Sequence, residues 1–370
     1  MRILHLYSGN LFGGIETLLV LLARDRGLCP TMEPVFGLCF GGRLADEIHE
    51  VGATVFQLGA VRASRPMTIL RARRALRRVI DAERFDAVVS HSPWVSGVFG
   101  PVLRRGAPPL VQWLHNPLTD SWVDRWGLRT RPRMVLCNSR YTAAAATSRF
   151  PQSTIEWMYY PVRLTVPRPA GEAREAVRRE LATPDDAVVI LQASRMQSWK
   201  GHHAHLDALA LLREVPNWVL WVVGGAQRPF ETRYLAGLRA RASDLGIADR
   251  VRFVGERGDV SQVMAAADIY CQPNTEPEPF GIVFLEALAA GLPVIAGDLG
   301  GPREVVDSSC GVLVPSGDIE VLASTLRGLI GDRARRRQLG TQGPGRARAL
   351  CDPATQLGRL SDLLGQVVSP

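Results

Sequence analysis

The chain has 370 residues, more than one hydrophobic core usually needs, and its 46% hydrophobic and 22% charged residues are typical of a soluble protein with two domains. It contains no apolar run of about 18 residues, so we expect no membrane-spanning helix. The residues from Met1 to Tyr7 predict a buried strand rather than a signal peptide. The net charge of +8 favours anionic substrates or surfaces.

The six cysteines are scattered, without the CxxC spacing of a zinc site or an evident disulfide framework. They predict small buried side chains in a reducing compartment, so we expect a cytoplasmic protein. They are Cys29, Cys39, Cys137, Cys271, Cys310 and Cys351.

Apolar segments alternate with helical segments along the first half of the chain, as in parallel α/β domains. The expected strands cover residues 3–7, 34–40, 54–58, 87–90, 110–114 and 134–138. The expected helices cover residues 16–25, 42–51, 69–83, 94–104 and 139–148. Four prolines between residues 161 and 184, around a charged helical stretch at 172–181, indicate a domain boundary.

The same alternation begins again in the second half. Its expected strands cover residues 187–193, 218–223, 251–254, 269–271, 293–296 and 311–314. Its expected helices cover residues 202–212, 230–245, 260–267, 281–290, 302–306 and 319–328. We therefore predict two Rossmann-like, doubly wound domains, 1–162 and 163–350, that face each other across a cleft. The tail, 351–370, has leucines at helical spacing and predicts a helix that either completes the second domain or returns to brace the first.

A basic region lies between residues 62 and 84. On a helix, its arginines form either a solvated face or a surface that docks on anionic lipid at the inner face of a membrane. No interleaved aromatic residues accompany them, so we expect no nucleic-acid binding. The arginines are Arg62, Arg65, Arg71, Arg73, Arg74, Arg77, Arg78 and Arg84.

A glycine-rich turn from Ser8 to Glu16 follows the first strand and opens a helix. Backbone N–H groups near Gly13 and Gly14 can approach an oxyanion closely in such a turn. The spacing fits neither the dinucleotide fingerprint nor a P-loop, and a tight strand–helix connection explains the glycines equally well.

A second motif, Arg195-Met-Gln-Ser-Trp-Lys200, lies between the strand at 187–193 and the next helix. Two cations at the carboxyl end of a strand, beside a helix start, can clamp a diphosphate. The two cations would also stabilise the negative charge that develops on the diphosphate when a sugar leaves it. The alternative is an ordinary charged loop.

The third motif has Glu278 and Glu286 at the ends of Glu-Pro-Phe-Gly-Ile-Val-Phe-Leu-Glu. On a helix, eight residues advance the chain by about 12 Å and nearly return to the starting face. Two carboxylates flanking the free N–H groups of a helix start suit a sugar nucleotide, which has hydroxyl groups at both ends and a diphosphate between them. The alternative is an amphipathic helix with surface glutamates, but Glu286 lies among apolar neighbours.

Together the three motifs resemble the retaining GT-B glycosyltransferases of family 4, the glycosyl transferases group 1. The resemblance covers nearly the whole chain and is most specific from Thr275 to Val306. It implies that the first domain binds the acceptor and that the second binds the sugar nucleotide, a UDP- or GDP-linked sugar.

The resemblance also implies roles for individual residues. Arg195 and Lys200 would grip the donor diphosphate, Glu278 would contact hydroxyl groups of the transferred sugar, and Glu286 would accept hydrogen bonds from the ribose. In the first domain, Gly13 and Gly14 would lie under the phosphate and His115 near the transferred sugar. The backbone that would line the sugar and phosphate belongs to Phe280, Gly281, Ile282 and Val283.

In the resembled family the anomeric configuration is retained, and the leaving phosphate takes the proton of the acceptor. We therefore expect no separate general base and no cofactor. We also expect no metal, because no Asp-x-Asp motif stands at a strand end and Arg195 with Lys200 would replace it. The histidines at 202, 203 and 205 are better explained by a helix start than by a metal site.

Two other functions remain open: an enzyme that hydrolyses or epimerises the donor without transfer, and a non-catalytic scaffold that binds a sugar nucleotide. An oxidoreductase is disfavoured because no dinucleotide fingerprint follows the first strand. The acceptor, whether a glycan in polysaccharide biosynthesis, a lipid-linked sugar or a small molecule, depends on loops of the first domain. There Trp94, Trp122 and Trp126 either stack on the acceptor or pack the domain.

Overall fold

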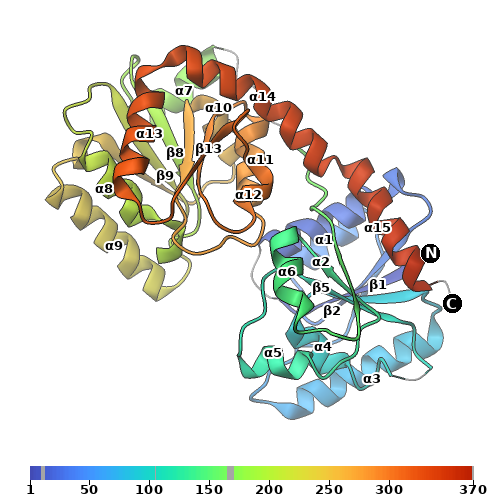
Figure 1. Ribbon diagram of the computed structural model, residues 1–370. Helices are drawn as coiled ribbons and strands as arrows, with labels where there is room; N and C mark the ends of the chain where they lie inside the picture. The colour runs from blue at the N-terminus through green and yellow to red at the C-terminus, as the bar shows by residue number, and fades with distance from the viewer. Residues whose placement is uncertain (10–12, 105, 165–170, 369–370) are drawn as a thin grey trace. The chain divides into compact units, whose positions relative to one another are not determined.

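The computed structural model describes residues 1–9, 13–104, 106–164 and 171–368 (Figure 1). The chain divides into two compact units: unit 1 comprises Met1–Arg163 with Cys351–Pro370, and unit 2 comprises Leu164–Leu350. In the described residues, each unit holds one parallel sheet covered by helices. The predicted α/β class, with two doubly wound sheets, is confirmed.

The sheet of unit 1 has the strand order β3-β2-β1-β4-β5-β6-β7. The chain begins in the middle of the sheet, moves outward to β3, and returns to the other side of β1 to continue to β7. Apolar side chains fill both faces of the inner strands, as in β1, whose last five residues are buried. The strands are β1 (Arg2–Tyr7), β2 (Glu33–Leu38), β3 (Val55–Gln57), β4 (Ala87–Ser90), β5 (Leu110–Leu114), β6 (Met134–Cys137) and β7 (Thr154–Trp157).

The helices of unit 1 include one from the far end of the chain. In α15 (Pro353–Val368), the Ser361 hydroxyl lies 3.0 Å from that of Thr31, and Arg359 donates to the carbonyl of Trp157 (2.9 Å). The leucines that the sequence places at helical spacing are buried in this unit. The other helices are α1 (Gly14–Arg24), η1 (Arg26–Leu28), α2 (Arg43–Glu50), α3 (Pro66–Ala82), α4 (Pro93–Phe99), α5 (Trp122–Gly127) and α6 (Arg140–Thr147).

The sheet of unit 2 has the order β10-β9-β8-β11-β12-β13, so β8 and β11 are neighbours in the middle. Its strands are β8 (Val188–Ala193), β9 (Trp218–Val223), β10 (Val251–Gly255), β11 (Ile269–Gln272), β12 (Val294–Gly297) and β13 (Gly311–Val314). Its helices are α7 (Glu172–Glu180), η2 (Ser198–Lys200), α8 (His202–Ala210), α9 (Pro229–Asp244), η3 (Ala248–Arg250), α10 (Val260–Ala266), α11 (Ile282–Ala289), α12 (Pro302–Val305), α13 (Ile319–Gly331) and α14 (Arg333–Cys351).

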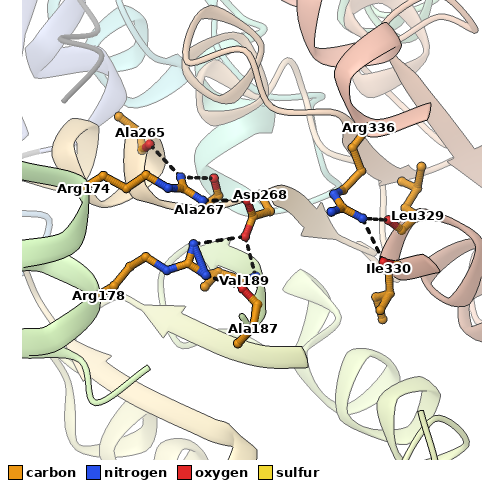
Figure 2. A network of polar contacts seen from close by, with 10 residues as sticks. All are labelled: Arg174, Arg178, Ala187, Val189, Ala265, Ala267, Asp268, Leu329, Ile330 and Arg336. Carbon is orange, nitrogen blue, oxygen red and sulfur yellow. Dashed lines mark hydrogen bonds and ion pairs between the residues drawn. The ribbon is translucent and has the colours of Figure 1, made fainter. Parts of the chain in front are cut away.

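Asp268 joins α7 to the amino ends of the central strands of unit 2 (Figure 2). Asp268, directly before β11, accepts hydrogen bonds from Arg174 of α7 (2.7 Å) and from the backbone N–H of Val189 in β8 (2.8 Å). Arg178 adds a second ion pair at 3.4 Å. Because ligands of such sheets bind at the carboxyl ends of the strands, we assign this network to stability.

Besides the short 3-10 helices η1, η2 and η3, three of the described elements were not predicted from the sequence. The strand β7 is short and lies at the sheet edge, and Ile155 and Trp157 are its only apolar residues. The six residues of α5 fall in a stretch that we expected to be a loop; Ser121 caps this helix by accepting from the N–H of Asp124 (3.2 Å). Such short elements carry too little periodicity to be recognised.

The third missed element, α14, contains three glycines and a proline, which normally indicate a loop. Two of the glycines instead form a contact face. A Cβ atom on Gly340 would lie 2.2 Å from the carbonyl oxygen of Gly291, and one on Gly343 would lie 2.5 Å from that of Leu288 in α11. Arg336 joins the same helix to α13 by donating to two of its last carbonyls (Figure 2).

Candidate functional site

A buried ion pair joins two of the predicted site residues in unit 2. The Lys200 ammonium donates to Oε2 of Glu278, and the two side chains are only 11% and 13% exposed. Lys200 follows β8 and Glu278 follows β11, so the two residues come from the carboxyl ends of neighbouring strands. Burial lowers the pKa of Lys200, and the Glu278 carboxylate opposes that shift.

Buried amides hold Glu278 in place. Asn274 Nδ2 donates to the same oxygen, Oε2 (3.0 Å), and Asn274 Oδ1 accepts from Gln272 (2.8 Å). Gln272 in turn accepts from the hydroxyl of Tyr270 (2.8 Å). Because both donors use Oε2, Oε1 of Glu278 has no donor among the described residues and can accept a hydrogen bond from a ligand hydroxyl.

Arg195 adds a second positive charge at the end of β8. Its exposed guanidinium has no hydrogen-bond or ion-pair partner in the described part of the chain, and its charge further lowers the pKa of Lys200. The loop that carries both cations turns at Gly201, whose φ is 78°. A Cβ atom there would lie 1.9 Å from the carbonyl oxygen of Pro273, so only glycine lets this loop lie against the loop that carries Glu278.

The helix α11 begins four residues after Glu278, at Ile282. Gly281, with φ of 93°, precedes the helix and offers no side-chain cap. The first N–H groups of a helix, here those of Ile282 and Val283, have no intrahelical partner. Phe280 is 1% exposed and anchors the turn in the core. Free N–H groups and the helix dipole make such a start favourable for an anion.

Glu286 lies one turn further along α11. Its half-buried carboxylate has no hydrogen-bond partner among the residues that the structure describes. Burial raises the pKa of Glu286 to about 7. A carboxylate kept without a protein partner is available to accept hydrogen bonds from a ligand.

In unit 1, His115 is part of a buried chain of histidines. His5 Nδ1 lies 3.0 Å from His91 Nε2, His91 Nδ1 lies 3.0 Å from His115 Nε2, and His115 Nδ1 meets the hydroxyl of Tyr160. Burial lowers the pKa of His5 and of His115 to about 3, so both are neutral at pH 7. Because His91 and Tyr160 occupy both ring nitrogens of His115, a hydrogen bond from His115 to a sugar would have to replace one of these two contacts.

The structure describes Ser8, Gly9 and the residues from Gly13 onward in the glycine-rich turn of unit 1, and residues 10–12 lie outside the described residues. Gly13 is in extended conformation and precedes α1, which begins at Gly14. The buried Glu16 in the first turn accepts a hydrogen bond from the hydroxyl of Tyr7. The contribution of Gly13 and Gly14 to a phosphate site stays a prediction.

The clustered histidines near Lys200 have partners of their own. His202 Nε2 lies 3.1 Å from the hydroxyl of Ser194, and His205 Nδ1 lies 2.8 Å from Oε1 of Gln192. His203 lies edge-on to the ring of Tyr234. These contacts join the start of α8 to β8 and α9.

Two family models together match most of the chain: glycosyl transferases group 1 over residues 173–346, and glycosyltransferase family 4 over residues 13–166. A GDP-mannose-dependent α-(1-6)-phosphatidylinositol monomannoside mannosyltransferase from Mycolicibacterium smegmatis is 30% identical over 311 residues, 78% of each chain. The chain belongs to the glycosyl transferases group 1. The predicted enzyme class, a glycosyltransferase, is thereby confirmed.

Other similar proteins agree with this family. A D-inositol 3-phosphate glycosyltransferase from Corynebacterium efficiens is 34% identical to this group 1 transferase over 303 residues, 75% of this chain and 70% of the relative. The crystal structure of Anabaena Alr3699/HepE in complex with UDP-glucose superposes with a TM-score of 0.84, at 25% identity, over 99% of this chain and 100% of that one. The predicted GT-B fold is confirmed.

In the group 1 transferase, unit 2 thus brings together Arg195, Lys200, Glu278 and the start of α11, and the same helix carries Glu286. The motifs did not reveal the amides of Gln272 and Asn274, which position Glu278. In the sequence, the only sign of Gln272 and Asn274 is that polar residues stand two positions apart where the apolar strand β11 ends. None of the described helices has the length and apolarity that a membrane span requires.

Proposed function

We propose that the protein is a retaining glycosyltransferase that moves a sugar from a UDP- or GDP-linked donor to an acceptor hydroxyl. The observation that carries the proposal is the Lys200–Glu278 pair beside the start of α11. It combines a cation for a diphosphate with a carboxylate oxygen for a sugar hydroxyl. Two similar proteins, one named as GDP-mannose-dependent and one solved in complex with UDP-glucose, support either nucleotide.

The proposed roles follow from which atoms are free. Arg195, the remaining N–H groups of Lys200 and the backbone at Ile282 and Val283 bind the diphosphate, with Phe280 and Gly281 shaping that turn. Oε1 of Glu278 accepts from a hydroxyl of the transferred sugar. Glu286 accepts from the ribose.

Leaving-group departure places negative charge on the β-phosphate, and the two cations stabilise that charge in the transition state. They make a divalent metal unnecessary in this proposal. Glu278 accepts from both Lys200 and Asn274, which suits it for orienting a hydroxyl rather than for removing a proton. The departing phosphate then takes the acceptor proton on the same face of the sugar, which retains the configuration. His115 would contribute a contact to the sugar.

We further propose that the acceptor is presented at an anionic membrane, at its cytoplasmic face. Two observations support this. A relative is named for a phosphatidylinositol monomannoside. The helix α3 exposes Arg71, Arg74 and Arg78 beside Met67 and Leu70, which are 55% and 41% exposed.

The test is a thermal-shift and nucleotide-release screen of UDP-glucose, UDP-galactose, UDP-N-acetylglucosamine and GDP-mannose, with and without a chelator. A donor that binds the folded state raises the melting temperature. We expect one donor to stabilise the protein in both conditions and Lys200→Ala to lower its turnover at least about 100-fold. Arg337→Gln, at an exposed site in unit 2, is the control. Full turnover by Lys200→Ala, or turnover only with metal, would contradict the proposed site.

A further inference from the structure

A cavity of about 550 Å³ in unit 1 is lined by three tryptophans, two arginines, Ala63 and Ile69. The ring centroid of Trp94 lies 5.4 Å from that of Trp126 and 6.1 Å from that of Trp122, with the rings edge to face. Trp122 nevertheless remains 56% exposed, although large aromatic side chains are usually covered. Its ring is therefore available to a ligand.

Close packing of α4 on α5 builds the wall of this cavity. A Cβ atom on Gly97 would lie 2.6 Å from the ring of Trp126, and one on Gly127 would lie 2.6 Å from the carbonyl oxygen of Pro93. Glycine at both contact points lets the two helices approach and fixes the Trp126 ring against α4. The aromatic wall is thus preformed.

Neither of the two arginines of the cavity is paired with a carboxylate in the described part of the chain. Arg125 and Arg129 are exposed, and neither guanidinium has a hydrogen-bond or ion-pair partner within the described ranges. The nearby carboxylates are occupied: Asp124 accepts from the N–H and hydroxyl of Thr119, and Asp120 pairs with Arg149.

The lining favours a lipid phosphate over a sugar. A sugar hydroxyl both donates and accepts, so sugar sites usually include Asp, Glu, Asn or Gln side chains, and none of the described residues that line this cavity is one of these. Leu70, the residue after Ile69 on α3, is 41% exposed. A second cavity, of about 960 Å³, shares Trp126 and Arg129 with the first and adds Arg104 and Arg131.

We propose that this cavity binds a lipid phosphate, with its apolar chain against Trp94, Trp122 and Ile69 and its phosphate on Arg125 and Arg129. The inference rests on the proposed function, for which it names the class of acceptor: a sugar or polyol carried on a lipid phosphate. Bidentate guanidinium contacts fix the phosphate, and the tryptophan rings hold the first carbons of the chain.

The probe is dodecyl phosphate, titrated into the full-length protein by calorimetry below the concentration at which it forms micelles. We expect binding that weakens at least about tenfold in Arg125→Gln/Arg129→Gln and in Trp122→Ala. Dodecyl maltoside, which has the chain without the charge, and inorganic phosphate should each bind at least about tenfold more weakly than dodecyl phosphate. Arg337→Gln and Phe230→Ala, at exposed positions of unit 2, should bind as the parent does.

Equal binding of dodecyl phosphate by the parent and by Arg125→Gln/Arg129→Gln would overturn the proposal, as would equal binding of dodecyl maltoside. Binding of methyl glucoside that Trp122→Ala abolishes would make the cavity a sugar site and would also overturn it. UDP and GDP are titrated in parallel. If a nucleotide binds and dodecyl phosphate does not, this inference fails alone; if dodecyl phosphate binds and neither nucleotide does, the proposed donor site fails.

Discussion

At the scale of single residues, Glu286 should make donor binding depend on pH. Burial raises its pKa from 4.5 to about 7. The ionised carboxylate is the stronger acceptor for ribose hydroxyls. We therefore expect the affinity for the donor nucleotide to rise between about pH 6 and about pH 8, and Glu286→Gln to flatten that rise. Calorimetric titration at both pH values measures it, and the same slope in both proteins would contradict the assigned role.

The Glu286 carboxyl group should also make the folded protein less stable as the pH rises, which is the opposite of its effect on donor binding. The folded state holds the Glu286 proton up to about pH 7, whereas the unfolded chain releases it near 4.5. Its contribution to the free energy of unfolding is therefore present below pH 4.5 and is lost as the pH rises through 7. Between those values the melting temperature of the parent should fall more steeply than that of Glu286→Gln. A parallel pH dependence of the two melting temperatures would show that the pKa of Glu286 is not raised in the folded state.

Replacing one partner of the Lys200–Glu278 pair should destabilise the protein more than replacing both partners together. Removing one partner leaves the other charge buried, so Lys200→Met and Glu278→Leu should each lower the free energy of unfolding by about 3–5 kcal/mol. The double variant should lose clearly less than the sum, since no charge is then left unpaired. Urea denaturation of the four proteins completes the cycle. Additive losses would mean that the pair is not coupled in solution.

At the scale of elements, replacing different glycines of α14 by alanine should change the stability of the protein in opposite directions. A Cβ atom on Gly340 would lie 2.2 Å from a carbonyl oxygen, whereas one on Gly345 meets nothing within 4 Å. Gly340→Ala should therefore destabilise the protein by about 1–3 kcal/mol. The matched change Gly345→Ala should stabilise it by about 0.5–1 kcal/mol through helix propensity. Equal shifts in melting temperature would refute this packing.

These glycines also show where sequence reasoning ends. The central strands were predictable, because apolar runs such as those of β1 and β8 report burial directly. The role of Gly340 was not, because it depends on Gly291, which is distant in sequence. The candidate site divides in the same way. The charged residues Arg195 and Glu278 stand in recognisable motifs, whereas the amides that orient Glu278 are visible only once β11 is placed beside β8.

At the scale of the whole molecule, α15 should stabilise unit 1 alone. Leu360 is completely buried there, so Leu360→Ala should cost about 2–5 kcal/mol. We expect calorimetry to show two transitions, one lowered by Leu360→Ala and the other raised by the donor nucleotide. Asp362→Ala, at an exposed position of the same helix, is the control. A single transition that responds to both perturbations would contradict separate stabilisation of the units.

The position of α15 also sets an order for biosynthesis. Unit 1 is built from two stretches of chain, and all of unit 2 is translated between them. Domains generally fold as units while the ribosome is still at work. Unit 2 therefore has all its residues while the surface of unit 1 that α15 covers is still bare. A nascent chain paused between residues 350 and 353 would expose this apolar patch to chaperones, and only synthesis of the last helix would close it.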